Sequence, residues 1–355
     1  MKRRIVGIFV CMILTLTVFS LSVSSYEPLE NTIYVDDDAP SEWYDETHVH
    51  TIQEGIDSAH AGGTVLIYEG VYHPSSNIFV HKELHLTGES KEKVIVEKEI
   101  GSEELSIRAK NIVISDITFI NFAVSNECYN DNLLITNNDF IINNHEGHWN
   151  PSLMDISGNN NEISNNIITF AELDHWKHNP SMGISFQCYQ SKIVNNIIVG
   201  KGRDFTALDI YDRTFWPHDI LLGENKIYGN VFMNNGCGIS VIPTLNSNHR
   251  SEITHNNFIE NKIHARFCIL FPSVIDIIRK ITEDIENTQY VFSVAKSSYN
   301  YWDSNYWDSY GGFGPKKLDG TIQTPGIINQ LFAYVFPWII FDWHPVKEPY
   351  DISMI

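Results

Sequence analysis

Two similar loops carry the side chains best suited to bind a ligand. One reads His148-Trp149-Asn150-Pro151-Ser152, and the other reads His175-Trp176-Lys177-His178-Asn179-Pro180-Ser181. Indole rings stack on the apolar faces of sugars, and polar side chains beside them hydrogen-bond to sugar hydroxyls. We therefore predict a carbohydrate-binding edge, and the alternative is that the two loops only pack on each other. The predicted ligand-binding residues are Trp149, Trp176, His148, His175, His178, Lys201 and Arg203.

Two carboxylates, Asp155 and Asp209, lie in the segments that these loops lead into. A carboxylate pair can act as acid and base in glycoside cleavage, and an inverting pair stands roughly 6.5–9.5 Å apart. Asp155 and Asp209 are expected two repeats apart, at or beyond the upper end of that range. They are our candidate catalytic residues, and a polysaccharide hydrolase or lyase is the alternative to a binding protein.

No other pattern points to catalysis. The sequence has no nucleophile elbow, P-loop, zinc-protease helix or dinucleotide fingerprint. His148, His175 and His178 would suit a transition metal if they converged, so metal handling is a second alternative. We predict no resident cofactor, with calcium and copper as the alternatives.

These residues belong to a chain that repeats with a period near 30 residues. From about residue 111 to 261, isoleucines followed by Asn recur at intervals of 28, 30, 34 and 26 residues, namely Ile135, Ile163, Ile193, Ile227 and Ile253. Such short segments, rich in Asn and Gly, favour strands over helices. One strand cannot bury its apolar side, whereas strands stacked about 4.8 Å apart bury continuous rows. The repeat predicts a solenoid.

Asparagine suits the corners of such a solenoid because it tolerates left-handed backbone. We expect an amide ladder of Asn138, Asn166, Asn196, Asn230 and Asn257. A second set of segments places Met154, Met182, Leu208 and Cys237 in one inward row. An outward row of Asp155, Gly183, Asp209 and Gly238 is expected beside it.

The cysteines give no sign of a disulfide or zinc framework. Cys128, Cys188, Cys237 and Cys268 show no paired or zinc-type spacing. Cys128 and Cys188 are expected two coils apart, roughly 10 Å, which exceeds disulfide reach. We expect all four cysteines to be unpaired and buried.

The segment before the repeat resembles the opening of pectin-lyase-like β-helix proteins. It reads Thr51-Ile-Gln-Glu-Gly-Ile-Asp-Ser-Ala, then Gly62-Gly-Thr-Val-Leu-Ile-Tyr-Glu-Gly-Val-Tyr72 and Leu84-His-Leu-Thr-Gly88. The repeats are similar to the NosD-like, carbohydrate-binding and sugar-hydrolase type. Over residues 31–310 the resemblance implies an all-β, single-stranded right-handed parallel β-helix with an N-terminal capping helix. It also implies a surface location and makes copper the metal of the metal-handling alternative.

The C-terminal part departs from the repeat. Asn300-Tyr-Trp-Asp303 and Asn305-Tyr-Trp-Asp308 look like the signature that closes such repeats, but two lysines in the loop up to Gly320 speak against calcium there. Isoleucines at helical spacing predict a small helical insertion. The expected domains are residues 1–25, a signal or anchor; 26–263, the β-helix with its cap; 264–289, the insertion; and 290–355, the last coil and a capping tail.

The N-terminal segment and the net charge limit where the protein can be located in the cell and which partners it can bind. Met1-Lys-Arg-Arg4 followed by an apolar run through residues 5–23 is typical of an export signal, with an uncleaved membrane anchor as the alternative. A formal charge of −20 disfavours a nucleic-acid partner. We expect an extracytoplasmic, non-catalytic protein that binds a carbohydrate polymer or another cell-surface component.

Overall fold

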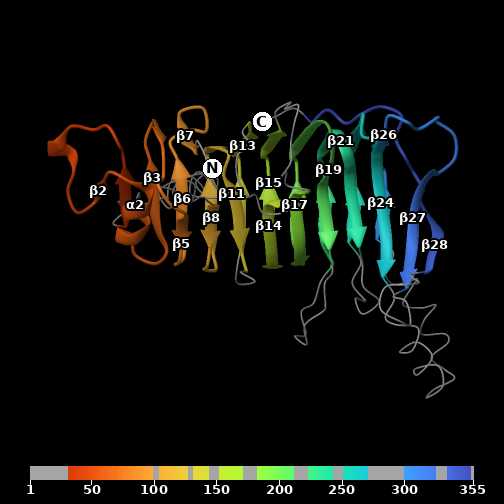
Figure 1. The fold of residues 1–355 in the computed structure, drawn as a ribbon, viewed down its shortest axis with the longest axis horizontal. Helices are drawn as coiled ribbons and strands as arrows, with labels where there is room; N and C mark the ends of the chain where they lie inside the picture. The colour runs from red at the N-terminus through yellow and green to blue at the C-terminus, as the bar shows by residue number, and fades with distance from the viewer. Residues whose placement is uncertain are drawn as a thin grey trace, which may run out of the picture.

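The computed structural model describes residues 31–98, 104–126, 131–143, 152–170, 182–211, 223–242, 251–270, 300–324 and 334–352. Their short strands stack side by side along one long axis (Figure 1). Among the described strands, one pairing at the C-terminal end is antiparallel and the others are parallel, and most of these join segments that lie about one coil apart in the sequence. The chain is a right-handed parallel β-helix, so the predicted fold class is confirmed.

From β3 onward, each coil contributes to three faces, called here faces A, B and C. Face A is one sheet, made of β2 (His48–Val49), β1 (Thr32–Val35), β3 (Gly63–Ile67), β6 (Leu84–Gly88), β9 (Ile112–Ser115), β12 (Leu133–Thr136), β15 (Glu162–Ser164), β18 (Lys192–Val194), β20 (Lys226–Tyr228), β22 (Glu252–Thr254) and β25 (Tyr301–Asp303).

Faces B and C form a second, continuous sheet. Face B holds β4 (Gly70–Tyr72), β7 (Val94–Glu97), β10 (Thr118–Ile120), β13 (Asp139–Ile142), β16 (Ile167–Phe170), the first parts of β19 (Ile197–Tyr211) and β21 (Val231–Ile242), β23 (Asn257–Ile259) and β26 (Tyr306–Trp307). Face C holds β5 (Ile78–Val80), β8 (Glu104–Ile107), β11 (Ala123–Asn126), β14 (Ser152–Asn159), β17 (Met182–Tyr189), the second parts of β19 and β21, β24 (Ile263–Leu270) and β27 (Lys316–Thr324).

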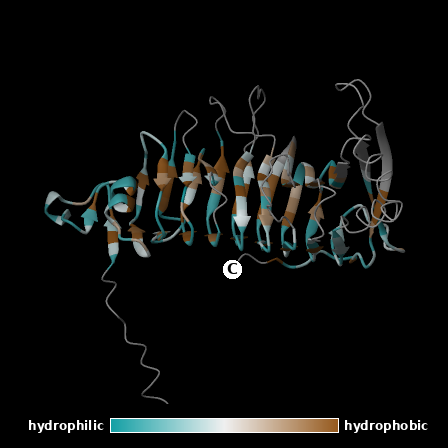
Figure 2. Cartoon of the chain, turned by 90° about the horizontal axis from the view of Figure 1, so that it is seen from below, coloured by the Kyte–Doolittle hydropathy of each residue, from teal (hydrophilic) through white to brown (hydrophobic). Residues whose placement is uncertain are grey.

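The core consists of rows of equivalent side chains that point inward from each face. On face A one row is almost entirely aliphatic and includes all five isoleucines that define the repeat; it runs Ile33, Val65, Leu86, Ile114, Ile135, Ile163, Ile193, Ile227, Ile253 and Trp302. On face B the rings of Phe232, Phe258 and Trp307 stack face to face. Hydrophobic residues therefore concentrate in the strands and hydrophilic residues in the turns (Figure 2).

An asparagine ladder fixes the corner between faces A and B. The amide Nδ2 and the backbone N–H of each ladder residue both donate to the Oδ1 of the next, so Asn166 bonds to Asn196, and Asn196 to Asn230. The ladder continues through Asn256, whose side chain accepts from Asn230. The predicted member Asn257 is wrong: it begins β23 and its side chain bonds to the backbone of Tyr350.

A left-handed residue precedes each ladder asparagine. Asn165 and Asn195 have φ values of 56° and 55°, and Gly229 takes the same place with φ 69°. Asparagine and glycine are the residues that adopt this backbone at least cost. The Asn-Asn pairs of the repeat thus divide two roles, because the first residue turns the chain and the second forms the ladder.

Both ends of the solenoid are covered. The predicted capping helix is α2 (Ile52–Ser58), which begins with a capping box between Thr51 and Glu54. Gly55 lets this helix approach β1, since a Cβ there would lie 2.7 Å from the Cγ2 of Val35. No helix among the described residues is long and apolar enough to cross a membrane.

At the other end, β28 (Tyr334–Asp342) pairs antiparallel with β27. Asp342 is fully buried, and its Oδ2 accepts from the backbone and side chain of Asn305 and from the indole of Trp307. β24 runs to Leu270, so the expected start of a helical insertion at residue 264 is too early. Residues 271–289 of that insertion lie outside the described residues.

Loss of one ladder amide should destabilise the protein strongly. In Asn196→Ala, the buried Asn166 backbone N–H and the Ile163 carbonyl lose their partner. Unsatisfied buried groups cost about 1–3 kcal/mol each, so we expect a loss of about 3–5 kcal/mol in urea unfolding. The matched control is Asn195→Gly at the exposed, left-handed neighbour, which should change stability by less than about 1 kcal/mol. Equal effects of the two substitutions would contradict the ladder's role.

Candidate functional site

The two candidate carboxylates lie in one outward row on face C. Parallel pairing sets Asp155 beside Ser185, Ser185 beside Asp209, and Asp209 beside Ser240. Ser125 precedes this series and Arg266 follows it. We call these six residues the face C row: Ser125, Asp155, Ser185, Asp209, Ser240 and Arg266. Two strand spacings separate Asp155 from Asp209, about 9.6 Å, as the sequence predicts.

The strand register on face C differs from the predicted one, because serines and not glycines lie beside the two aspartates. Gly183 and Gly238, which were expected beside the aspartates, instead share a row with Ala207. Likewise Met182 and Cys237 pair with Thr206, whereas Met154 and Leu208 share the row of Ile184. The prediction was therefore right for the two aspartates and wrong by two residues for the strands that carry the glycines.

Variable loops explain this slip. Met154 follows the ladder residue Asn138 by 16 residues, whereas Leu208 follows Asn196 by only 12. Sequence spacing therefore cannot fix the register on face C. A shift of two residues also keeps every side chain on its own side of the strand, so the hydrophobic pattern does not reveal it.

Asp155 is a partly buried carboxylate with few interaction partners among the described residues. Burial raises the pKa of the Asp155 carboxyl above its ordinary value, and a hydrogen bond from the Ser185 side chain opposes this rise. No cation from the described residues contributes to this balance. Within the described residues, Asp155 is therefore a carboxylate whose negative charge lacks a counter-charge.

Asp209 lies deeper and is partly neutralised. Only 8% of the residue is exposed, and burial raises its pKa against the opposing effects of a Ser240 hydrogen bond and the Arg266 charge. Arg266 reaches back along the row, because its Nη2 lies 3.3 Å from the Thr206 Oγ1 on the strand of Asp209. Even so, the Oδ1 of Asp209 has no hydrogen-bond partner within the described part of the chain, and neither does the buried Oγ of Ser125.

Face A shows how outward polar side chains look when they satisfy one another. There Thr87 and Ser115 are 2.9 Å apart at their hydroxyl oxygens, and the Oγ of Ser164 donates to Thr136 at 3.1 Å. Glu162 pairs with Lys192 at 3.1 Å on the same face. Face A also has a buried hydroxyl without a partner among the described residues, Thr32 Oγ1, but on the face C row the unpartnered Oδ1 of Asp209 belongs to a carboxylate, which marks this row as the better candidate for a ligand.

Most of the predicted binding residues lie outside the part of the chain that the structure describes. His148, Trp149, His175, Trp176 and His178 lie outside the described residues, so the aromatic edge and the histidine metal site stay predictions. Lys201 and Arg203 belong to β19 near its irregularity between faces B and C, but their side chains also lie outside the description. Sequence reasoning missed Ser185, Ser240 and Arg266, whose only signal was their position two residues after Gly183, Gly238 and His264.

Two of the four cysteines, Cys188 and Cys237, lie among the described residues, and both are free and buried as predicted. Burial raises the pKa of the Cys188 thiol to about 12 and that of the Cys237 thiol to about 11. Thiols of this kind are poor nucleophiles and poor metal ligands at neutral pH. Cys128 and the side chain of Cys268 lie outside the described residues.

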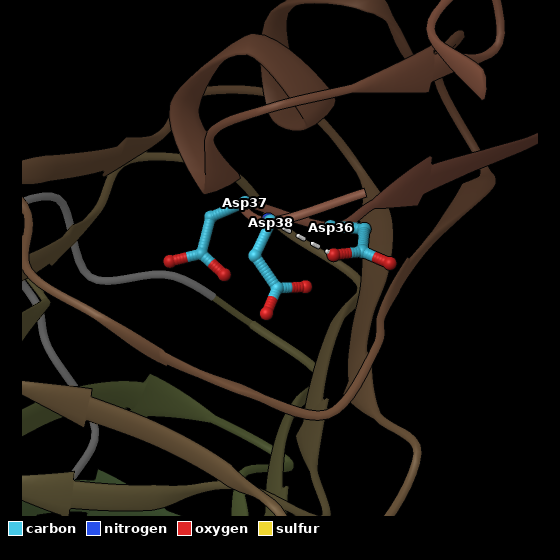
Figure 3. A group of neighbouring side chains, drawn as sticks. All are labelled: Asp36, Asp37 and Asp38. Carbon is cyan, nitrogen blue, oxygen red and sulfur yellow. Dashed lines mark hydrogen bonds between the residues drawn. The ribbon is translucent and has the colours of Figure 1, made fainter. Parts of the chain in front are cut away.

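A second polar cluster follows β1 at the N-terminal end. One carboxylate oxygen from each of Asp36, Asp37 and Asp38 lies within 4.8 Å of the other two (Figure 3). The backbone N–H of Asp38 donates to Asp36, and burial raises the pKa of Asp37. Oxygen ligands suit a hard cation such as Ca²⁺. However, two of the three residues are exposed, and this acidic run carries no further feature of a built site.

A His–Asp pair joins the end of face C to the last coil. The Nε2 of His264 lies 2.8 Å from the Oδ1 of Asp308, and burial lowers the pKa of the histidine. Its ring packs near Phe258 and Trp307. This pair therefore ties β24 to the cap among aromatic residues of the core.

Comparisons with known proteins support no assignment to a family. No family model matches the sequence, and no curated protein matches it. Among solved structures, the mannuronan C-5 epimerase AlgE6 A-module of Azotobacter vinelandii is similar at 13% identity and TM-score 0.37, covering 78% of this chain and 82% of that one.

Two further structures are similar at the same level. A pectin methylesterase variant in complex with a hexasaccharide has 13% identity and TM-score 0.30, covering 68% of this chain and 78% of that one. ORF18 of Geobacillus virus E2 has 12% identity and TM-score 0.29, covering 80% and 59%. At such identities and TM-scores, these likenesses carry no function to this chain.

The raised pKa of Asp209 predicts a pH-dependent stability. A carboxyl whose pKa is raised above 3.8 contributes stability that is complete below that pH and is lost as the pH rises through the raised pKa. Asp209→Asn removes the charge without changing the shape, so its thermal midpoint should exceed that of the wild type near neutral pH. The difference should close on acidification to about pH 4. Parallel midpoint-against-pH curves would contradict this account of Asp209.

Proposed function

We propose that this protein binds a linear carbohydrate polymer along the face C row without cleaving it. The observation that carries the proposal is the row itself, where acceptors recur along the solenoid axis and the buried Asp209 Oδ1 and Ser125 Oγ lack donors. Sugar hydroxyls supply such donors, and a linear polymer supplies them repeatedly along a line. The Trp149 and Trp176 loops, which lead into β14 and β17, would add stacking surfaces beside the row.

The proposal includes an extracytoplasmic location. The basic start and the apolar run through residues 5–23 support export, with anchoring through the same run as the alternative. A structural or adhesive role at the cell surface agrees with this location. Metal handling through His148, His175 and His178 remains an alternative, and none of the described residues supports it.

The binding proposal predicts that the row carboxylates are needed for glycan binding. On a glycan array, Asp155→Asn/Asp209→Asn should lose at least tenfold in affinity for any glycan that the wild type binds, since charged hydrogen bonds contribute about 1.5–3 kcal/mol each. Glu162→Gln on face A is the matched control and should bind as the wild type does. A double variant that binds every glycan normally would place the site elsewhere.

The loop tryptophans need their own variant. Trp149→Ala/Trp176→Ala should weaken the same binding without shifting the thermal midpoint, because stacking surface is lost while the row persists. Unchanged glycan binding in this variant would remove the aromatic edge from the proposed site, and the face C row would then stand alone.

Inverting hydrolysis is the second candidate, and the two raised carboxyl pKa values favour it. Burial raises the pKa of both carboxyls, and a raised pKa is the direction that suits a general acid. Against it stands the separation of about 9.6 Å, which is at the upper limit for inverting pairs. We expect no new reducing ends from any bound glycan. Release of reducing ends that Asp155→Asn or Asp209→Asn abolishes would replace binding by hydrolysis as the function.

A further inference from the structure

The face C row holds more negative charge than its described surroundings offset. Its hydroxyls and carboxylates accept hydrogen bonds, and its one cation, Arg266, acts on Asp209. Among the described residues, Asp155 has the Ser185 hydroxyl as its partner and receives no positive charge. The Oδ1 of Asp209, in a residue more than nine-tenths buried, still lacks a donor among the described residues. A ligand that completes this row must bring donors and positive charge.

The geometry excludes a single small cation as that ligand. Asp155 and Asp209 are separated by about 9.6 Å along the axis, whereas a bound Ca²⁺ holds its oxygen ligands at about 2.3–2.6 Å. A ligand that meets both carboxylates must therefore carry donor or cationic groups that are spaced along a line. The formal charge of −20 attracts polycations to the surface and repels polyanions.

Resting on the proposed function, we propose that the polymer bound by this row is an amino sugar chain with free amino groups. In a flat β-1,4-linked chain, alternate residues present the same side. Ammonium groups would then meet Asp155 and Asp209 on every second strand, while Ser185 and Ser240 bond to hydroxyls in between. A uronic acid polymer would instead bring carboxylates against carboxylates.

The test compares ligands that differ in one group. Binding of the whole protein to a β-1,4-linked glucosamine hexamer, its N-acetylated counterpart and a galacturonate hexamer is measured by calorimetry at pH 6 and low salt. We expect the glucosamine hexamer to bind at least tenfold more tightly than the N-acetylated one, and the galacturonate hexamer not to bind. Added salt should weaken the preferred complex, since the attraction is ionic.

Single variants locate the preference. Asp155→Asn and Asp209→Asn should each cut affinity for the glucosamine hexamer about tenfold, and affinity for the N-acetylated hexamer only about threefold, because an uncharged hydrogen bond is lost there rather than an ionic one. Glu162→Gln on face A should behave as the wild type, which separates a local site from general attraction. Thermal unfolding of each variant checks that the fold is intact.

The outcomes distinguish this inference from the proposed function. Equal affinity for the two hexosamine chains, or a preference for the N-acetylated or anionic chain, would overturn the inference and leave carbohydrate binding in place. A preference for the glucosamine chain that survives in both aspartate variants would also overturn it, because the attraction would arise elsewhere. Failure to bind any glycan, on the array as well, would overturn both.

Discussion

The structure depends on one interaction, the bond between stacked asparagine amides at the corner of faces A and B. A ladder residue such as Asn196 donates twice to the next coil, and its amide also donates to the Ile163 carbonyl of the preceding coil and to the Val194 carbonyl of its own coil. A buried corner has no water to satisfy its backbone groups, so the amides supply the missing partners. The ladder also sets the axial spacing, because consecutive amides bond only when the coils are one strand spacing apart.

The direction of the ladder explains its end. All the amides donate toward the C-terminus, so the last member, Asn305, presents donors and needs an acceptor. Asp342 supplies one, and a carboxylate can accept all three hydrogen bonds at that point without bringing a donor of its own. The strand that carries it, β28, also pairs with β27 and so covers the last coil. Closure of the solenoid and completion of the ladder are thus one contact.

Because the corner between faces A and B is rigid, the segments on the opposite side of the solenoid can vary in length. The segments that lead to face C differ in length from coil to coil, yet the strands of that face still pair in register. Long loops beside a straight, regular row are a common basis for a binding site, because the scaffold holds the row while the loops change. The unpartnered carboxylate oxygen of Asp209 lies on this variable side of the solenoid.

The sequence by itself determined the coil. The isoleucine and asparagine periods predict the fold, the inward row of face A and four of the five named ladder residues, and the separate segment that begins at Thr51 predicts the capping helix. Each of these depends on local pattern and nearest-neighbour stacking. The shared row of Asp155 and Asp209 was also predicted. Only the tertiary structure decided that Ser185, Ser240 and Arg266 complete that row and that Asp342 ends the ladder. Those placements depend on loop lengths and on contacts between distant segments, and a strand pattern of period two cannot distinguish registers that differ by two residues.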